Sequence, residues 1–229
     1  MKTTAVLMAA GEAKRMNAGK NKSFLKLREP ILVHTLDALE KNAKINDIIL
    51  VINEKDRTEC ENVLSQRPFK KIRKIVEGGK IRQESSYNGV FAVEDSDIIL
   101  IHDCARPFVS QECINNSIND AVEHGISVVA VPAKDTIKMG SGEFVVKTLD
   151  RSNLWIIQTP QTFKTEIIKE AHKRAREDDF ISTDDTSLAE RLGYKVKITP
   201  GHYDNIKITT PDDLILAEKI LDNKRGKDV

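Results

Sequence analysis

Short apolar runs rich in Val and Ile alternate along the chain with longer segments of helical period. This alternation is typical of a mostly parallel sheet flanked by helices, so the predicted fold class is α/β. In open sheets of this class, ligands bind beyond the carboxyl ends of the strands. We therefore expect functional residues in the segments that follow the apolar runs. The runs predict strands at residues 4–9, 48–52, 74–77, 98–102, 127–132 and 196–199.

Length and charge restrict the class of protein further. A chain of 229 residues, 40% of them hydrophobic, can bury a substantial core, and one domain over residues 1–229 is expected. The 36 Lys and Arg residues balance 35 Asp and Glu residues, so nucleic acid or an anionic membrane is not an expected partner. The three cysteines show no CxxC spacing, which argues against a disulfide framework or a zinc site. No signal-peptide core or transmembrane run is recognised in the sequence, and a cytoplasmic enzyme is expected.

The first predicted strand leads into a small-residue turn and then into a basic segment. Ala9, Ala10 and Gly11 have side chains small enough for a polyphosphate to approach backbone N–H groups. The basic side chains that follow are Lys14, Arg15, Lys20 and Lys22. The segment matches neither GxGxxG nor the Walker pattern. It predicts a phosphate site of another kind, although these residues alone also allow a solvated basic surface loop.

Two further segments place polar groups after predicted strands. Gly78 and Gly79 permit a tight turn before a helix with Arg82 and Ser85 in its first turns, where a base or phosphate could be held, or where Arg82 could simply face solvent. Asp103, directly after the strand at 98–102, is a natural Mg²⁺ ligand. The nearby Arg106 offers a two-pronged phosphate contact, and a surface Asp–Arg ion pair is the alternative. His102 is expected to be a packed strand residue and Cys104 an inert buried thiol.

Other local signals concern turns and helix ends. Residues 134–155 hold two strand-like runs around Gly140–Glu143 and predict a β-hairpin, packed on a second subunit or forming an ordinary sheet edge. Pro30 is expected as the first residue of a helix, and Thr210 as the N-cap of the last helix. Residues 183–185 are expected to cap a helix over 187–192, and residues 158–161 are expected to form a turn. Residues 205–209 are expected to form a short strand in which Lys207 faces solvent.

Taken together and in this order, the segments closely resemble the 2-C-methyl-D-erythritol 4-phosphate cytidylyltransferases of non-mevalonate isoprenoid synthesis. The resemblance spans nearly the whole chain. The motifs that carry it are AAGEAKRM with NKSFL, EGGKIRQESSYNG, HDCARPF, PAKDTIK, LDRSNLWIIQTPQTF, STDD and DNIKIT. It implies a three-layer α/β/α nucleotidyltransferase fold, Rossmann-like, in which a projecting β-arm at about residues 134–155 builds a homodimer.

The resemblance also implies roles for individual residues. Asp103 is expected near Mg²⁺ and the sugar phosphate, whereas Lys80 stands where the family frequently has Asp, which puts a base or ribose contact in doubt. Residues expected at the nucleotide are Ala9, Ala10, Gly11, Gly79, Arg82 and Ser85, with Arg15 and Lys22 on its phosphates. Residues expected around methylerythritol phosphate and the reacting phosphate are Arg106, Thr136, Arg151, Thr159, Thr183 and Lys207, with Arg151 reaching across the dimer. Those expected to carry catalysis are Arg15, Lys22 and Lys207.

The implied chemistry follows from charge. A phosphate monoester has a second pKa near 6, so the polyol phosphate already carries a nucleophilic oxygen at neutral pH. Its attack on the α-phosphate of CTP, with Mg²⁺ present, would release pyrophosphate, and the enzyme's task is mainly positioning and electrostatic stabilisation. A ribitol 5-phosphate cytidylyltransferase is the alternative enzyme, although AAG and HDCARP favour methylerythritol phosphate. A nucleotide-binding module without turnover is the alternative from another class, and the retained cationic groups argue against it.

Overall fold

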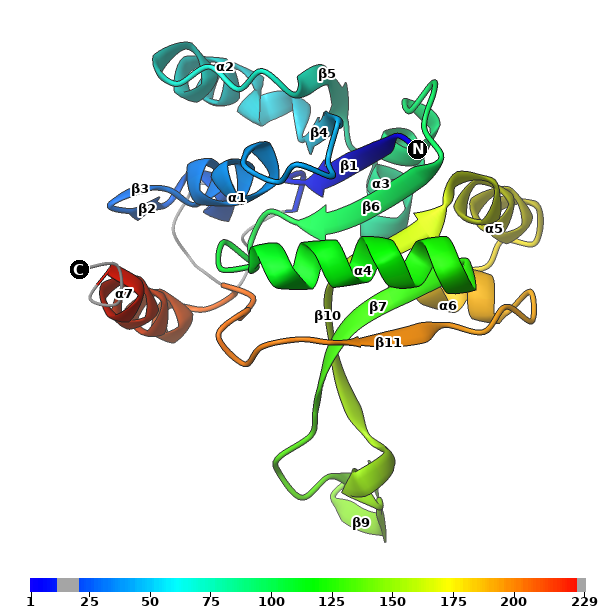
Figure 1. Cartoon of the computed structure of the whole chain (residues 1–229). Coiled ribbons are helices and arrows are strands. Elements are labelled where there is room, and N and C mark those ends of the chain that lie inside the picture. Colours follow the sequence, from blue (N-terminus) through cyan, green and yellow to red (C-terminus); the bar gives the residue numbers. More distant parts are fainter. Residues whose placement is uncertain (12–20, 226–229) are drawn as a thin grey trace.

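The computed structural model describes residues 1–11 and 21–225, and its centre is a seven-stranded sheet of order β11-β7-β10-β6-β1-β4-β5 (Figure 1). β10 pairs antiparallel with both β6 and β7, whereas the other pairings in this sheet are parallel. This confirms the predicted α/β class and its mostly parallel sheet. The strands are β1 (Thr3–Met8), β4 (Asp47–Ile52), β5 (Ile72–Glu77), β6 (Ile98–Asp103), β7 (Ile126–Pro132), β10 (Trp155–Lys164) and β11 (Lys197–Pro200).

The prediction of a turn at residues 158–161 is wrong, because these residues lie within β10. The register of the β10–β7 pairing shifts between Ile157 and Gln161, so Pro160 sits in a bulge, where its missing N–H interrupts no ladder hydrogen bond. The strand was not predicted there because proline is depleted in strands and rare in a central strand. Gln158, Thr159 and Gln161 are nevertheless buried.

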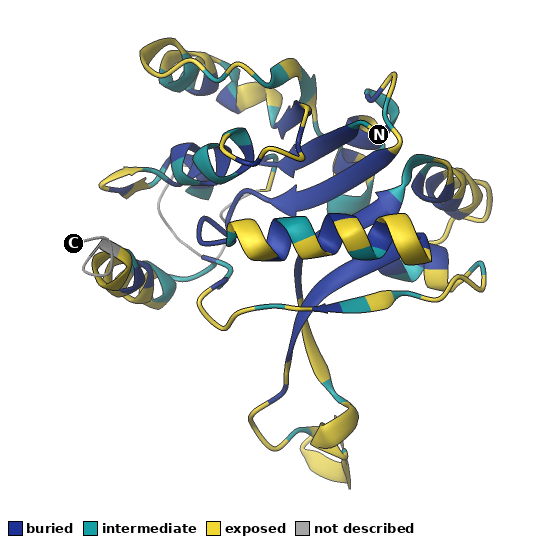
Figure 2. Ribbon diagram, in the orientation of Figure 1, coloured by how far each residue is buried: buried dark blue, intermediate teal, exposed yellow. Residues whose placement is uncertain are grey.

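Helices cover both faces of the sheet, as the alternating side chains of β1 require. Ala5 and Leu7 pack with α1 (Ile31–Glu40), α2 (Arg57–Gln66) and α4 (Gln111–His124). Val6 and Met8 belong to the opposite core, with α3 (Arg82–Phe91), α5 (Thr165–Glu177) and α6 (Thr186–Glu190). Figure 2 shows the buried sheet between exposed outer helix surfaces. The three-layer arrangement that the resemblance implied is therefore present.

A smaller core lies beside the sheet, where α7 (Pro211–Arg225) packs near β2 (Lys26–Leu27), β3 (Glu29–Pro30) and the start of α1. Pro30 immediately precedes α1 rather than opening it, because it pairs with Lys26 in the β2–β3 ladder. The N-cap prediction for Thr210 is confirmed: its Oγ1 accepts the Asp213 N–H at 3.3 Å, and its own N–H donates to the Asp213 carboxylate at 2.8 Å. Residues 205–209 are irregular, so the strand expected there is wrong.

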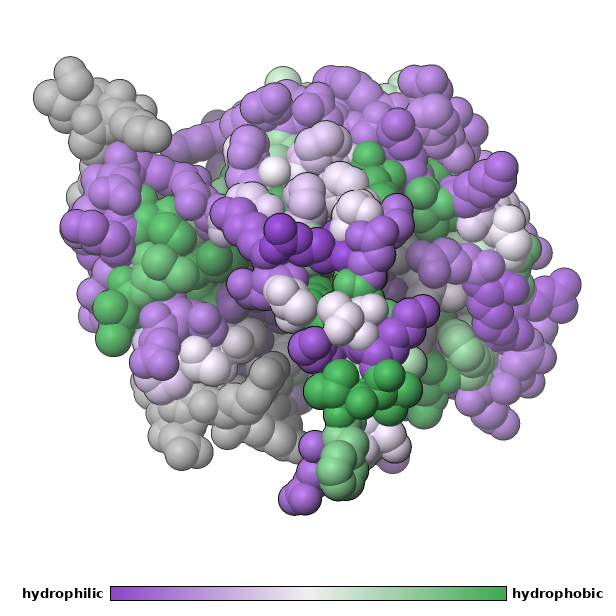
Figure 3. All heavy atoms as spheres, turned by 90° about the horizontal axis from the view of Figure 1, so that it is seen from below, coloured by the Kyte–Doolittle hydropathy of each residue, from purple (hydrophilic) through white to green (hydrophobic). Residues whose placement is uncertain are grey.

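The predicted hairpin is confirmed as β8 (Lys138–Ser141) paired antiparallel with β9 (Phe144–Thr148), followed by a 3-10 turn at Arg151–Asn153. Together with its stem, residues 134–155, it projects away from the rest of the molecule (Figure 1) and is named the arm below. Figure 3 views the molecule from the end where the arm projects and shows hydrophobic residues clustered among hydrophilic ones. Exposed apolar side chains on the arm and the adjoining part of β10 are Met139, Phe144, Val145, Val146, Trp155, Ile156 and Ile157.

Among the helices of the described residues, none combines the length and the apolar character needed to cross a membrane.

Candidate active site

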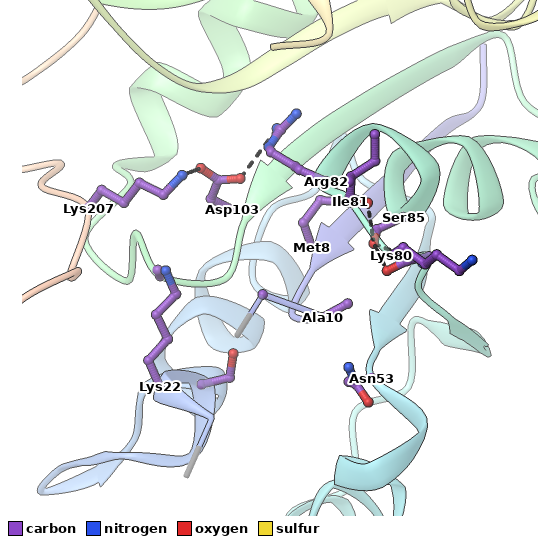
Figure 4. A pocket seen from close by; sticks show the side chains of 14 residues that line it. Met8, Ala10, Lys22, Asn53, Lys80, Ile81, Arg82, Ser85, Asp103 and Lys207 are labelled. Carbon is purple, nitrogen blue, oxygen red and sulfur yellow. Dashed lines mark hydrogen bonds and ion pairs between the residues drawn. The ribbon is translucent and has the colours of Figure 1, made fainter. Parts of the chain in front are cut away.

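A cavity of about 350 Å³ opens at the carboxyl edge of the sheet, where β6, β1, β4 and β5 end side by side. Met8 and Asp103 are the last residues of β1 and β6, and Asn53 directly follows β4. The segment after β5 and the start of α3 form another wall (Figure 4). The cavity is lined by Met8, Ala10, Gly11, Lys22, Ser23, Asn53, Gly79, Lys80, Ile81, Arg82, Ser85, Asp103, Ala105 and Lys207.

The structure brings together many of the residues singled out in the sequence. Those that line the cavity are Ala10, Gly11, Lys22, Gly79, Arg82, Ser85, Asp103 and Lys207. Ala9 lies just behind the wall: it is buried, its N–H donates to the Val51 carbonyl at 2.7 Å, and its carbonyl accepts from the Asn21 amide at 2.9 Å. Arg15 lies outside the described residues.

The turn before α3 requires glycine because the chain passes very close to its neighbours. A Cβ added to Gly78 would lie 2.5 Å from the Ala10 Cβ and 2.8 Å from the Ser85 Oγ. The Gly79 N–H donates to Ser85 Oγ at 3.0 Å, while the Ser85 hydroxyl also contacts the Ile81 carbonyl at 3.1 Å. The result is a fixed wall of small groups facing Ala10, with space beside it for a flat or phosphate-bearing ligand.

Opposite charges alternate across the floor of the cavity. Lys207 Nζ lies 2.7 Å from one carboxylate oxygen of Asp103, and Arg82 Nη2 lies 3.4 Å from the other (Figure 4). Burial alone would raise the pKa of Asp103, but Arg82 and Lys207 outweigh it and hold the pKa well below its usual range. Asp103 is therefore ionised, and its negative charge is compensated from two sides. The expectation that Lys207 simply faces solvent is wrong.

Arg82 is itself anchored from behind by a buried carboxylate. Its Nη1 donates to Asp185 Oδ2 at 2.7 Å, and Asp185 is 1% exposed. Ser86 Oγ donates to Asp185 Oδ1 at 2.5 Å, and the Asp185 N–H donates to the Gln161 side chain at 3.0 Å. Burial would raise the pKa of Asp185, but Arg82 and the hydrogen bonds lower it overall. Arg82 is thus held in place by a residue that does not line the cavity.

Arg106 lies outside the cavity lining and is buried. Its Nη1 donates to the Asn205 carbonyl at 2.7 Å and its Nη2 to the Ile157 carbonyl at 3.3 Å. Burial lowers its pKa. The alternative of a surface Asp–Arg ion pair is wrong, because Arg106 is only 9% exposed and its Nη1 and Nη2 donate to backbone carbonyls. Its predicted contact with phosphate stays a prediction.

His102 and Cys104 are packed, as expected. His102 is fully buried, and burial lowers its pKa to about 4. Cys104 is equally buried, and burial raises the pKa of its thiol to about 12, which removes thiolate reactivity at neutral pH. Thr159 is also buried, against His102 and Asp103.

Three further predicted site residues are exposed and lie away from the cavity in this chain. Thr136 and Arg151 are exposed on the arm, where Arg151 Nη1 donates to the Lys134 carbonyl at 2.6 Å. Thr183 is exposed before α6 and lines a different pocket. Asp185 is the N-cap residue of α6 and its side chain makes no cap hydrogen bond, whereas Asp184, one residue earlier, accepts the Ser187 N–H through Oδ1 at 3.1 Å. The helix runs from Thr186 to Glu190, so it begins and ends earlier than expected.

The sequence reasoning missed three contributors. Asn53 directly follows β4, so the same strand-end rule that selected Asp103 applies to it. Lys80 also lines the cavity, although it stands where the family frequently has Asp and no role was expected for it. Asp185 was considered only as part of a helix cap, and no local signal links it to Arg82, which lies 103 positions away.

The donor set fits a divalent cation shared with a ligand rather than a cation held by the protein alone. Among residues 1–11 and 21–225, no group of three or more His, Cys, Asp or Glu side chains is placed to hold a metal ion. Asp103 supplies one ionised carboxylate in the cavity. Mg²⁺ commonly takes one or two protein carboxylates and fills its remaining positions with phosphate oxygens and water. Asp103 therefore fits an ion that arrives with a nucleotide.

Comparisons with known proteins agree with this geometry. The model of the family described as 2-C-methyl-D-erythritol 4-phosphate cytidylyltransferase matches residues 3–223. Relatives with that name from Geobacillus kaustophilus and Bacillus velezensis are 46% and 47% identical over 228 residues, covering 99% of this chain and 100% and 98% of theirs. The crystal structure of 4-diphosphocytidyl-2C-methyl-D-erythritol synthase from Anaerococcus prevotii superposes with a TM-score of 0.84 at 32% identity, covering 96% of this chain and 98% of that one. The chain therefore belongs to the 2-C-methyl-D-erythritol 4-phosphate cytidylyltransferase family, whose members are nucleotidyltransferases.

Proposed function

We propose that the cavity at the carboxyl edge binds CTP and that this chain transfers the cytidylyl group to 2-C-methyl-D-erythritol 4-phosphate. Family membership supports the reaction, and one structural observation supports its location. Lys22, Arg82 and Lys207 come from distant parts of the sequence and line one cavity around an ionised Asp103. Such a cluster suits a polyphosphate that must meet a second anion.

The small-residue wall is assigned to the nucleotide. Ala10 and Gly11 follow β1, and Gly79 and Ser85 face them across the cavity. Close packing at Gly78 keeps this gap narrow, so a ligand here contacts backbone groups rather than long side chains. Lys80 lines the same wall, and we assign it to the periphery of the nucleotide. The predicted phosphate role of Arg15 remains part of this proposal.

The reaction itself requires positioning more than proton transfer. An oxygen of the polyol phosphate forms a new bond to the α-phosphorus of CTP, and the bond to the β-phosphate breaks, so pyrophosphate leaves with its electron pair. Negative charge accumulates on the α-phosphate oxygens, where Lys22 and Lys207 stabilise it. Arg82 is held by Asp185 and is assigned to orienting the nucleotide.

The residue assigned to a divalent cation is Asp103. Bound with CTP, such an ion supplies Lewis-acid neutralisation of the phosphate oxygens. Asp103 also keeps the Lys207 ammonium directed into the cavity at 2.7 Å. Its carboxylate therefore has two tasks, holding the ion and orienting the lysine.

The arm is assigned to a homodimer. Phe144 is 81% exposed and Val145 is 62% exposed, and such side chains gain free energy when a partner covers them. Thr136 and Arg151 lie on the arm outside the cavity of their own chain. A second copy is therefore proposed to receive Arg151 near its polyol phosphate.

The test is pyrophosphate release by the purified protein with CTP, Mg²⁺ and 2-C-methyl-D-erythritol 4-phosphate. Parallel reactions contain ribitol 5-phosphate, or replace CTP by ATP, GTP or UTP. Release confined to CTP with methylerythritol phosphate is the expected result. A preference for ribitol 5-phosphate would overturn the substrate assignment while keeping the chemistry. Stabilisation of the fold by CTP without pyrophosphate in any reaction would indicate a binding module instead.

A further inference from the structure

Three buried polar side chains surround the bulge of β10 without lining the cavity. His102 is 0% exposed, Thr159 is 3% exposed and Asn205 is 1% exposed. Burying such groups is costly unless they are hydrogen-bonded, and a connected network restricts its members to one arrangement. The network lies directly behind Asp103 and next to the loop that carries Lys207.

Hydrogen-bond donors and acceptors in this network can be assigned from its chemistry. His102 Nε2 lies 3.1 Å from the Arg106 carbonyl, which can only accept, so Nε2 carries the proton. The neutral ring then presents Nδ1 as an acceptor. Thr159 Oγ1 lies 2.9 Å from Nδ1, so the Thr159 hydroxyl donates to it. A lone pair of the same hydroxyl accepts the Asp103 N–H at 3.0 Å. The Thr159 proton is therefore already committed to His102.

The backbone carbonyl of Thr159 acts on the other side of the bulge. It accepts the Asn205 side-chain amide at 2.9 Å, and the same amide donates to Gln158 Oε1 at 3.1 Å. The Asn205 carbonyl is in turn held by Arg106 at 2.7 Å. Lys207 follows two positions later, and the Ile208 N–H bonds to the Ala105 carbonyl at 2.9 Å. The loop bearing Lys207 is thus attached to the same residue that fixes Asp103.

We infer that Thr159 is a positioning residue, whose hydroxyl, oriented by His102, fixes Asp103 and whose carbonyl, through Asn205, fixes the loop of Lys207. One residue of β10 thereby sets the spacing of the two charged groups that meet at 2.7 Å in the cavity. This inference rests on the proposed function, and it differs from a direct contact between the Thr159 hydroxyl and substrate. A displacement of about 1 Å in such a pair can cost roughly 100-fold in rate.

Thr159→Val tests the inference because it keeps the side-chain shape and removes the hydroxyl. We expect kcat for pyrophosphate release to fall roughly 10- to 100-fold while the KM values for CTP and the polyol phosphate stay within about threefold. Thr159→Ser restores the hydroxyl and should restore most of kcat. Thr162→Val is the matched control. Thr162 lies in the same strand, is fully buried and hydrogen-bonds Ser117 away from the cavity, so its loss should lower the melting temperature but not kcat.

His102→Phe provides a second route, because it keeps a ring and removes the acceptor for Thr159. Its loss of kcat should not add to that of Thr159→Val in the double variant, since both break one chain of hydrogen bonds. A Thr159→Val enzyme with normal kcat, or with a tenfold higher KM for the polyol phosphate at unchanged kcat, would overturn the inference. So would additive losses in the double variant. Failure of wild-type turnover would overturn the proposed function and this inference with it, whereas active wild-type protein with an unaffected variant would overturn the inference alone.

Discussion

The ammonium of Lys207 and the carboxylate of Asp103 lie 2.7 Å apart at the cavity floor, although one comes from an irregular loop and the other from the end of β6. Arg82 contacts the same carboxylate from the other side, so two cationic side chains share one anionic group. When a phosphate enters, the cations can shift part of their interaction to it. The cavity therefore holds positive charge in place before the ligand arrives.

Removal of the Lys207 charge should impair chemistry more than nucleotide binding. We expect Lys207→Met to lower kcat by roughly 10²- to 10³-fold, because stabilisation of the transition-state charge is lost. The dissociation constant of CTP, measured by calorimetry, should change far less. Lys219→Met on the exposed face of α7 is the control and should retain normal kcat. A Lys207→Met enzyme with near-normal turnover would remove Lys207 from the mechanism.

Loss of the anchor behind Arg82 should weaken nucleotide recognition. Asp185→Asn keeps the side-chain shape but removes the charge that holds Arg82 at 2.7 Å. Hydrogen bonds to charged groups contribute about 1.5–3 kcal/mol, so kcat/KM for CTP should fall roughly 10- to 100-fold. Asp178→Asn breaks an exposed ion pair with Arg191 and should leave kcat/KM unchanged. Equal behaviour of the two variants in steady-state kinetics would contradict the anchoring role.

Acid should destabilise the fold through the same carboxylate. The pKa of Asp185 is lower in the folded chain than in the unfolded chain, so its contribution is fully present above pH about 4 and is lost as the pH falls further. The free energy of unfolding, measured with urea from pH 7 to pH 2.5, should therefore decline below pH about 4. The decline should be shallower in Asp185→Asn. Parallel curves for the two proteins would mean that Asp185 contributes nothing to acid sensitivity.

The narrow wall before α3 should not tolerate even one methyl group. In Gly78→Ala the new Cβ would lie 2.5 Å from the Ala10 Cβ. The backbone at Gly78 or at Ala10 must therefore move away from the other. We expect CTP affinity, measured by calorimetry, to drop at least about tenfold. At Gly140 in the arm the nearest atom to an added Cβ is 3.4 Å away, and Gly140→Ala should bind CTP normally. Unchanged affinity in Gly78→Ala would place the nucleotide elsewhere.

A charge on the tip of the arm should break the proposed homodimer. Phe144→Glu places a carboxylate where an apolar contact is proposed. The mass measured by analytical ultracentrifugation should therefore fall from that of a dimer to that of a monomer. Activity should fall with it, because Arg151 would no longer reach the second cavity. Ile215→Glu on α7, where the native side chain is 69% exposed, controls for added surface charge. Monomeric wild-type protein with full activity would contradict the dimer proposal.

Sequence patterns predicted those features that depend on local periodicity. The strands of the sheet, the helix cap at Thr210 and the hairpin all follow from side chains close in sequence. The error at residues 205–209 has a physical reason: Ile206 and Ile208 alternate as in a strand, but they pack in the small core beside α7. The periodicity of apolar residues indicates which side chains are buried, but it does not indicate which element they pack against.

Residues whose roles depend on distant partners could not be placed in this way. Arg106 has the chemistry of a phosphate ligand, yet its Nη1 and Nη2 donate to backbone carbonyls of Asn205 and Ile157. Asp185 has the local signature of a cap, yet its side chain holds Arg82. In both cases the deciding contacts join segments that meet only after the sheet has formed.

The reversed direction of β10 has a geometric consequence for assembly. The arm leaves β7 at its carboxyl end and returns to the sheet through the amino end of β10, where Trp155 pairs with Pro132. If β10 ran parallel to β7, the chain would have to cross back to the amino edge of the sheet before β10 could begin. Here the arm begins and ends at the carboxyl edge of the sheet, the edge at which the cavity opens. A partner subunit packed on the arm, as proposed above, would therefore lie on the side of the molecule toward which the carboxyl ends of β6, β1, β4 and β5 also point.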